Sequence, residues 1–234
     1  MEQTAHNPLK LLLFDIDGTI LQTHGVGRRA VEKTVSELVG RNISTKEIRF
    51  SGKTDPQIIR EVLTATGLSP ADVDALMAPA LDRYAELMHE TLDPERVTVL
   101  PGVRGLIEEL SEDPNLQLAV LTGNLEPMAH LKLSAAGLAT YFPFGAFGSD
   151  HEVRDELPAI ALKRAHAYTG RHFRGKDIVI IGDTEYDIRC GMSVGAFAIG
   201  VCTGNYRRED LALHGPDAIL DDLNDYALFR SHLG

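Results

Sequence analysis

The chain has 234 residues, of which 44% are hydrophobic and 24% are charged, with a formal net charge of −11. This length suits one sizeable domain or a domain with a smaller insert, and the negative charge argues against binding to nucleic acid or to an anionic membrane. Two cysteines cannot form a disulfide framework, the N-terminal residues lack the pattern of a signal peptide, and no segment has the length of a membrane span. We therefore predict a cytoplasmic protein that binds neither nucleic acid nor membrane. Its oligomeric state stays open, with a monomer favoured.

The first predicted strand covers residues 11–14 and runs directly into acidic residues. Residues 11–19 read LLLFDIDGT, so that Asp15 and Asp17 follow four apolar positions. A continuous apolar run is typical of a parallel strand that is covered on both faces. Ligands of open α/β sheets bind outside the carboxyl ends of the strands, and we therefore expect both carboxylates at a ligand site.

The next segment, residues 23–98, has no convincing strand pattern and is predicted to be helical. One helix is expected to begin near Pro56 and another near Pro70, and both have apolar residues three and four positions apart. Pro79 is expected to kink the second of these helices. The predicted domains are an α/β catalytic core of residues 1–22 and 99–234 and an inserted helical cap of residues 23–98.

The remainder of the chain alternates between predicted strands and predicted helices. Further strands are expected at residues 116–121, 178–181 and 196–201. Helices are expected at residues 103–110, 126–136, 157–168 and 184–194. This alternation predicts an α/β fold with a doubly wound parallel sheet.

A second strand end carries a similar acidic pair. Residues 178–187 read IVIIGDTEYD, which places Asp183 at the end of the strand and Asp187 about one helical turn later. Capping of the following helix is the alternative explanation for these two side chains. Carboxylates that converge on one site repel each other unless a cation neutralises them, and Mg²⁺ prefers such oxygen ligands. Two acidic strand ends in one chain therefore favour a shared metal site.

Between the acidic pairs, a predicted strand ends on Thr122, Gly123 and Asn124. A hydroxyl group and backbone amides at a strand-to-helix turn are suited to hold a phosphate. An ordinary turn capped by Asn or Thr is the alternative. The same tripeptide recurs at residues 203–205, which makes it a weak signal by itself.

The segments FDIDGT, VLTGN and IIGDTEYD, in this order, resemble the haloacid dehalogenase-like superfamily of phosphotransferases. The resemblance covers essentially the whole chain, because the helical segment lies where this family has a helical cap. It implies a core sheet of order 5-4-1-2-3 with the active site under the cap. It further implies a Mg²⁺-dependent phosphomonoester hydrolase, similar to the phosphoglycolate phosphatases, that acts on a small phosphorylated metabolite through an aspartyl-phosphate intermediate. Members that cleave carbon–halogen or phosphonate bonds lack this DxD arrangement, so that phosphate esters are the expected substrates.

The resemblance also implies a role for each motif. Asp15 would be the nucleophile, and Asp17 would be the general acid and base. The residues expected to bind the phosphoryl group are Thr122, Gly123, Asn124 and Arg154. The residues expected to hold Mg²⁺ are Asp15, Asp17 (through its backbone carbonyl), Asp183 and Asp187.

Arg154 is included because the family has a basic residue, usually lysine, before the helix that leads into its last motif. Residues 148–165 read GSDHEVRDELPAIALKRA, in which Arg154 is the only basic residue ahead of the helix. One Mg²⁺ does not balance several carboxylates and a phosphate dianion, and a guanidinium beside Asp15 would supply further positive charge. A surface arginine that pairs with Glu152 or Asp155 is the alternative.

Two glycine motifs suggest other functions. Residues 25–30, GVGRRA, match a dinucleotide-binding pattern but do not directly follow a strand, and residues 51–54, SGKT, lack the first glycine of a P-loop. We expect the first segment to form the hinge into the cap. Lys53 and His24 could each contact the substrate, or they could be a solvated lysine and a hinge contact. The histidines show no spacing typical of a zinc site.

Two alternatives to a phosphatase remain. A sugar phosphomutase of the same superfamily shares the core motifs and the type of cap. A catalytically idle binding module on this fold would be expected to have lost Asp15, Asp17 or Asp183, and all three are present.

Overall fold

The computed structural model describes residues 10–234, and the preceding segment, for which no signal peptide is expected, lies outside the described residues. Its centre is a six-stranded parallel sheet of order β5-β4-β1-β6-β7-β8. The strands are β1 (Lys10–Phe14), β4 (Leu116–Leu121), β5 (Gly145–Ala146), β6 (Ile178–Gly182), β7 (Phe197–Val201) and β8 (Ala218–Leu220). From β7 to β5 the core strands follow the expected order 5-4-1-2-3, and the predicted α/β fold class is confirmed.

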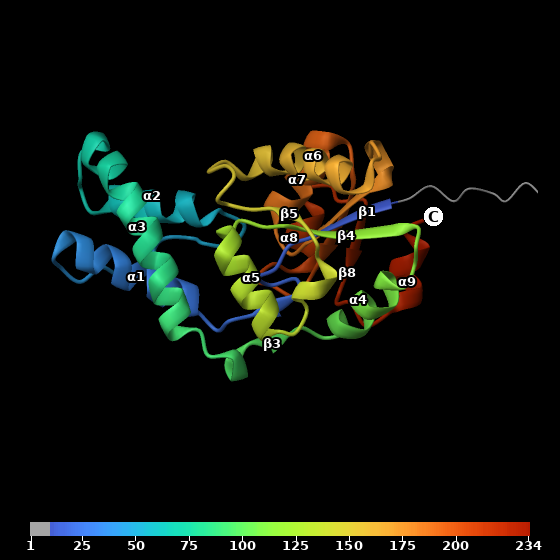
Figure 1. Ribbon diagram of the computed structural model, residues 1–234, viewed down its shortest axis with the longest axis horizontal. Coiled ribbons are helices and arrows are strands. Elements are labelled where there is room, and N and C mark those ends of the chain that lie inside the picture. The colour runs from blue at the N-terminus through green and yellow to red at the C-terminus, as the bar shows by residue number, and fades with distance from the viewer. Residues whose placement is uncertain (1–9) are drawn as a thin grey trace, which may run out of the picture.

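Helices cover both faces of this sheet (Figure 1). Leu12 and Phe14 of β1 pack against α4, α5 and α9, whereas Leu11 and Leu13 pack against α6 and α7. The helices of the core are α4 (Val103–Ser111), α5 (Glu126–Ala135), α6 (Leu157–Thr169), α7 (Glu185–Val194), α8 (Arg208–Ala212) and α9 (Tyr226–Ser231). Short 3-10 turns occur at Pro94–Arg96, Ala139–Tyr141, Arg154–Glu156 and Gly175–Asp177. Because β1 is buried on both faces, its sequence is continuously apolar.

Three helices form a separate layer beside the sheet (Figure 1), namely α1 (Val26–Val39), α2 (Asp55–Ala65) and α3 (Pro70–Thr91). They share a hydrophobic core of their own, which also includes two residues at the start of α5. The helix α3 continues through Pro79 as one element. We call this layer the cap.

The two connections between the cap and the core lie side by side. There, β2 (Leu21–Gln22) pairs antiparallel with β3 (Thr98–Val99). This pair lies at the limits predicted for the inserted domain. None of the helices within residues 10–234 combines the length and the apolar content needed to cross a membrane.

Candidate active site

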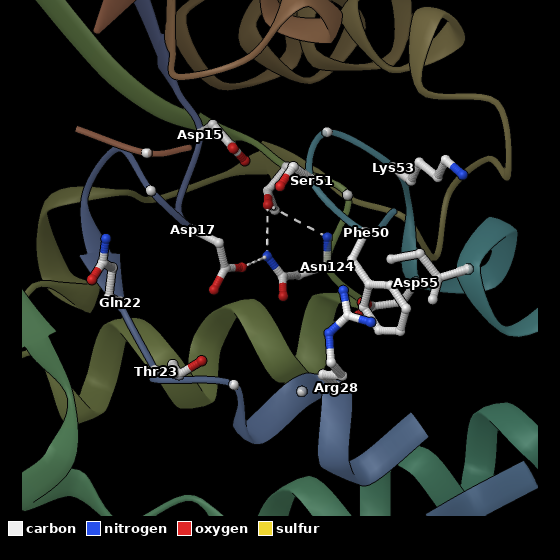
Figure 2. Close-up of a pocket in the computed structure, with 18 of the residues that line it drawn as sticks. Asp15, Asp17, Gln22, Thr23, Arg28, Phe50, Ser51, Lys53, Asp55 and Asn124 are labelled. Atoms are coloured by element: carbon white, nitrogen blue, oxygen red, sulfur yellow. Dashed lines mark hydrogen bonds between the residues drawn. The ribbon is translucent and has the colours of Figure 1, made fainter. Parts of the chain in front are cut away.

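The acidic strand ends meet at the carboxyl edge of the sheet, on the side of the cap. Asp15 follows β1 and Asp183 follows the neighbouring strand β6. Both line a cavity of about 380 Å³ between core and cap, which is a volume typical of pockets for small ligands. Figure 2 shows Asp15, Asp17 and Asn124 from the core opposite Ser51 and Phe50 from the cap.

Three carboxylates form a compact buried cluster. Asp15, Asp183 and Asp187 each offer an oxygen atom, and these atoms lie within 4.8 Å of one another. Burial raises the pKa of Asp15 to about 6, although Arg154 acts in the opposite direction. Burial, together with the charges of Asp15 and Asp187, raises the pKa of Asp183 well above its usual value. Since clustered carboxylate oxygens are the ligands that a hard divalent cation prefers, these residues fit a metal such as Mg²⁺.

Asp187 both caps the helix α7 and lies in the acidic cluster, which are the two possibilities that its sequence position suggested. Its Oδ2 accepts hydrogen bonds from the backbone nitrogen of Thr184 at 3.0 Å and from the Thr184 hydroxyl at 2.7 Å, so that it caps α7. Asp187 also belongs to the acidic cluster, and its Oδ1 accepts a hydrogen bond from Arg154 at 2.5 Å. Both oxygens are therefore engaged by the protein, and coordination of a metal by Asp187 stays a prediction.

Arg154 lies where the family resemblance implies a basic residue. Its side chain is 3% exposed, and Nη2 is 3.1 Å from Oδ1 of Asp15. The surface pairing considered as the alternative is absent among the described residues, because Glu152 pairs with Arg60 and Asp155 pairs with Arg189. Arg154 therefore places a buried positive charge directly against the predicted nucleophile.

The turn after β4 connects the predicted phosphoryl site with Asp17. The Asn124 side-chain nitrogen donates to the Thr122 hydroxyl at 2.8 Å and to Oδ2 of Asp17 at 2.7 Å; a dashed line marks the Asp17 contact in Figure 2. A side chain at Gly123 would collide with the cap, since an added Cβ would lie 2.2 Å from the carbonyl oxygen of Lys53. The side chain of Asn124 is thus occupied by Asp17 and Thr122, and its contact with a phosphoryl group stays a prediction.

Lys132 of α5 is a site residue that the sequence analysis missed. Its Nζ lies 2.6 Å and 2.8 Å from the two carboxylate oxygens of Asp17. The signal available in the sequence is its position, because Lys132 shares the buried face of α5 with Met128, Ala129 and Leu133. A lysine on an otherwise apolar helix face requires a buried partner.

The recurrent Thr-Gly-Asn tripeptide at residues 203–205 also belongs to the site. An added Cβ on Gly204 would lie 1.6 Å from a carboxylate oxygen of Asp183, and one on Gly18 would lie 2.5 Å from it. The hydroxyl of Thr203 donates to the carbonyl oxygen of Gly18 at 2.6 Å. The second Thr-Gly-Asn tripeptide therefore has a structural role of its own, because its backbone packs closely against the side chain of Asp183.

Asp55 joins the cap to the core, and the sequence analysis predicted only that a helix begins near the following residue, Pro56. Its carboxylate accepts hydrogen bonds from the backbone nitrogen of Leu125 at 2.8 Å and from the hydroxyl of Tyr84 at 3.3 Å. Burial raises the pKa of Asp55 to about 6, with Lys132 acting in the opposite direction. Asp55 lines the same cavity as Asp17.

The two tentative substrate contacts on the cap side have partners within the protein. Nζ of Lys53 lies 2.5 Å from a carboxylate oxygen of Glu61. Nε2 of His24 lies 2.8 Å from the hydroxyl of Thr98 and so joins the two cap connections. Both residues also line the cavity, and their contact with a substrate stays a prediction.

The chain matches the family model described as haloacid dehalogenase-like hydrolase over residues 12–201. A phosphoglycolate phosphatase from Pseudomonas putida is 23% identical over 219 residues, which cover 92% of this chain and 77% of that protein. The pyrophosphatase PpaX from Listeria monocytogenes is 25% identical over 221 residues, with coverages of 92% and 93%. A solved structure from Clostridium acetobutylicum, called a predicted phosphatase, superposes with a TM-score of 0.75 at 17% identity and covers 96% of this chain and 100% of that chain.

The parallel six-stranded sheet with helices on both faces places the chain in the α/β class. The chain belongs to the haloacid dehalogenase-like hydrolase family, and its enzyme class is that of a phosphatase.

Proposed function

We propose that the protein is a Mg²⁺-dependent phosphomonoesterase that hydrolyses a small phosphorylated metabolite through an aspartyl-phosphate on Asp15. The observation that carries this proposal is the contact of Arg154 with Asp15, a member of the acidic cluster, in a cavity that Asp17 and Thr122 also line. The proposed nucleophile, the proposed proton donor and the groups proposed to hold a phosphoryl oxygen line the same cavity. This is the set of groups that phosphoryl transfer requires.

In the first step, a carboxylate oxygen of Asp15 attacks the phosphorus atom, and the bond from phosphorus to the ester oxygen breaks. Asp17 donates a proton to the leaving alkoxide. The hydroxyl of Thr122 and the backbone after it hold the phosphoryl oxygens, while Arg154 balances their negative charge. In the second step, Asp17 takes a proton from a water molecule that attacks the acyl phosphate and releases inorganic phosphate.

Asp15, Asp183 and the backbone carbonyl of Asp17 would hold Mg²⁺, with Asp187 as a further predicted ligand. The bound cation would supply positive charge that lets the anionic ester approach an anionic nucleophile. Asp187 contributes in any case, because it anchors Arg154 through the contact of 2.5 Å. The Nε atom of Arg154 is buried without a hydrogen-bond partner among residues 10–234, which leaves a donor for an incoming anion.

The cavity accommodates a substrate of metabolite size, because about 380 Å³ lies at the small end of known ligand pockets. Phe50 and Ser51, which lie between α1 and α2, also line the cavity (Figure 2). They would select the group that carries the phosphate. We further propose a cytoplasmic location, since both cysteines are unpaired, and we retain the monomer as the expected state.

The test is a screen of phosphorylated metabolites for Mg²⁺-dependent release of inorganic phosphate by the purified protein. Mass spectrometry of the enzyme quenched in acid during turnover should find the phosphoryl group on Asp15. Phosphate release without any label on Asp15 would contradict the covalent mechanism. Transfer of a phosphoryl group between positions of a sugar phosphate, primed by a sugar bisphosphate, would instead favour the mutase.

A further inference from the structure

Lys132 is directed at a catalytic group from the interior of the protein. Its side chain is 4% exposed, and its ammonium group contacts both carboxylate oxygens of Asp17, at 2.8 Å and 2.6 Å. A third contact of 2.5 Å joins Nζ to the side-chain oxygen of Asn124. The residue comes from α5, which is separated from Asp17 by 115 positions in the sequence.

These contacts account for the whole hydrogen-bonding capacity of the lysine. An ammonium group has three N–H donors and no acceptor. Three acceptor atoms surround Nζ, two on Asp17 and one on Asn124. Lys132 is therefore saturated by these two side chains, and it does not serve as a donor to the substrate while they are in place.

Asn124 completes a clamp around Asp17. Its side-chain nitrogen donates to Oδ2 of Asp17, while its side-chain oxygen accepts from Lys132. The same nitrogen contacts Thr122. The carboxylate of Asp17 is thereby tied to the residue that is predicted to hold the phosphoryl group.

Asp17 requires such support because, within residues 10–234, Lys132 and Asn124 supply all the side-chain hydrogen bonds to its carboxylate. Its side chain is 42% exposed, whereas that of Asp15 is 6% exposed. It also lies beyond the end of β1, where its backbone forms an isolated bridge with Leu21. Lys132, by contrast, projects from a helix whose neighbouring residues Met128, Ala129 and Leu133 are buried. A side chain on a packed helix can hold a loop residue within the narrow tolerance that proton transfer demands.

We propose that Lys132 is the positioning residue of the general acid, and that together with Asn124 it holds the Asp17 carboxylate at the ester oxygen of the substrate. This inference rests on the proposed function. Lys132 does not provide the positive charge beside the nucleophile, because it is Arg154 that contacts Asp15. Lys132 therefore serves the step in which the leaving group receives its proton.

This role predicts a dependence on the leaving group. An alkyl phosphate releases a strongly basic alkoxide, which requires a proton, whereas 4-nitrophenyl phosphate releases a stable phenolate. The parameter kcat/KM reports the steps up to release of the alcohol and does not include hydrolysis of the aspartyl-phosphate. We expect Lys132→Met to lower kcat/KM by about 100-fold for an alkyl phosphate and by less than about fivefold for 4-nitrophenyl phosphate.

Four further variants make the test specific. Asp17→Asn should show the same split between the two esters, and the double variant Asp17→Asn, Lys132→Met should be no slower on the alkyl ester than Asp17→Asn alone. Lys163→Met, which changes an exposed lysine of α6, should leave kcat/KM unchanged for both esters. Equal losses on the two esters in Lys132→Met, or additive losses in the double variant, would overturn the inference. If Lys132→Met does not fold, the same measurements are made on Lys132→Gln, which keeps a polar group.

Failure of the proposed function gives a different result. In that case the wild-type protein releases phosphate from neither ester, and crystal structures decide the inference. The Asp17 carboxylate should occupy one position in the wild-type protein and several in Lys132→Met. A single unchanged position in both proteins would overturn the positioning role.

Discussion

Among single residues, Asp15 is the one whose replacement should stop the reaction altogether. Asparagine has the same shape as aspartate but cannot form an acyl phosphate. We expect Asp15→Asn to show no turnover above background while its melting temperature is equal to or above that of the wild type, because a buried carboxylate with a pKa of about 6 is replaced by a neutral group. Phosphate release and thermal unfolding of the same sample check this. Normal release by the variant would exclude Asp15 as the nucleophile.

Arg154 should contribute to the rate through its charge beside Asp15. We expect Arg154→Met to lower kcat by about 10²–10³-fold, comparable to the loss of one strong electrostatic stabiliser, and Arg154→Lys to recover part of the loss. Arg189→Met is the matched control, since that arginine pairs with Asp155 away from the cluster. Steady-state kinetics on the folded fraction of each variant measures the effect. A wild-type kcat for Arg154→Met would remove Arg154 from the mechanism.

Asp55 should make the free energy of unfolding depend on pH. Its pKa is raised by burial to about 6 in the folded protein, above the value near 3.9 of an unfolded chain. Its contribution to stability is therefore fully present below about pH 4 and is lost as the pH rises through about 6.

Asparagine at position 55 can still accept from Leu125 and stays neutral at every pH. Relative to the wild type, Asp55→Asn should gain about 2–3 kcal/mol between pH 4 and pH 8. Urea unfolding of both proteins at the two pH values measures this difference. A constant difference between the two proteins would contradict the raised pKa.

The sequence identified the acidic residues of the site but not the groups that hold them. Asp15 and Asp183 follow apolar strands and are visible as local patterns, and Arg154 was placed by comparison with a family pattern. Lys132 and Gly204 act through contacts with Asp17 and Asp183, which are distant in the sequence. Their roles depend on which segments the fold brings together, and no local spacing encodes this.

At the scale of elements, the turn after β4 and the start of α2 fit together through Gly123. The backbone nitrogen of Asp55 donates to the carbonyl oxygen of Gly123 at 2.7 Å, and a side chain at Gly123 would overlap the carbonyl of Lys53. We expect Gly123→Ala to push the cap away from the core, which should raise KM and lower kcat. Faster hydrogen exchange at the amide of Asp55 would be the direct evidence. Unchanged protection of this amide would show that the cap loop adapts without moving.

The long strands were predictable and the short ones were not, and the helix α1 lies over residues that were partly expected to form the hinge into the cap. The strands β1, β4, β6 and β7 lie within a residue or two of their predicted positions, because continuous apolar runs are strong signals. The strands β2 and β3 have two residues each, which is too short for an apolar pattern to be detected in the sequence. The helix α3 continues on both sides of Pro79, so that the proline does not end it, and the kink expected there stays a prediction.

At the scale of the whole molecule, the acidic cluster should link the stability of the fold to a divalent cation. A ligand that binds only the folded chain stabilises it by about 2.7 kcal/mol at a hundred times its dissociation constant. We expect MgCl₂ to raise the melting temperature, EDTA to reverse the effect, and Asp183→Asn to abolish it. NaCl at matched ionic strength is the control for general salt effects. A wild-type melting temperature that is insensitive to MgCl₂ would contradict a metal site in this cluster.

The position of β1 in the middle of the sheet also has a consequence for synthesis on the ribosome. Its two neighbours, β4 and β6, begin at Leu116 and Ile178, so that the central strand leaves the exit tunnel long before either partner exists. The helices of the cap are complete by Thr91 and have a hydrophobic core largely of their own, and they can assemble during this interval. Meanwhile the strand Leu11–Phe14 is an unpaired apolar segment, which is the kind of sequence that chaperones bind and that aggregates when it is left exposed. We expect nascent chains that end between the cap and β6 to hold a folded cap beside an unprotected strand, and to acquire protection at Leu12 only after β6 has emerged.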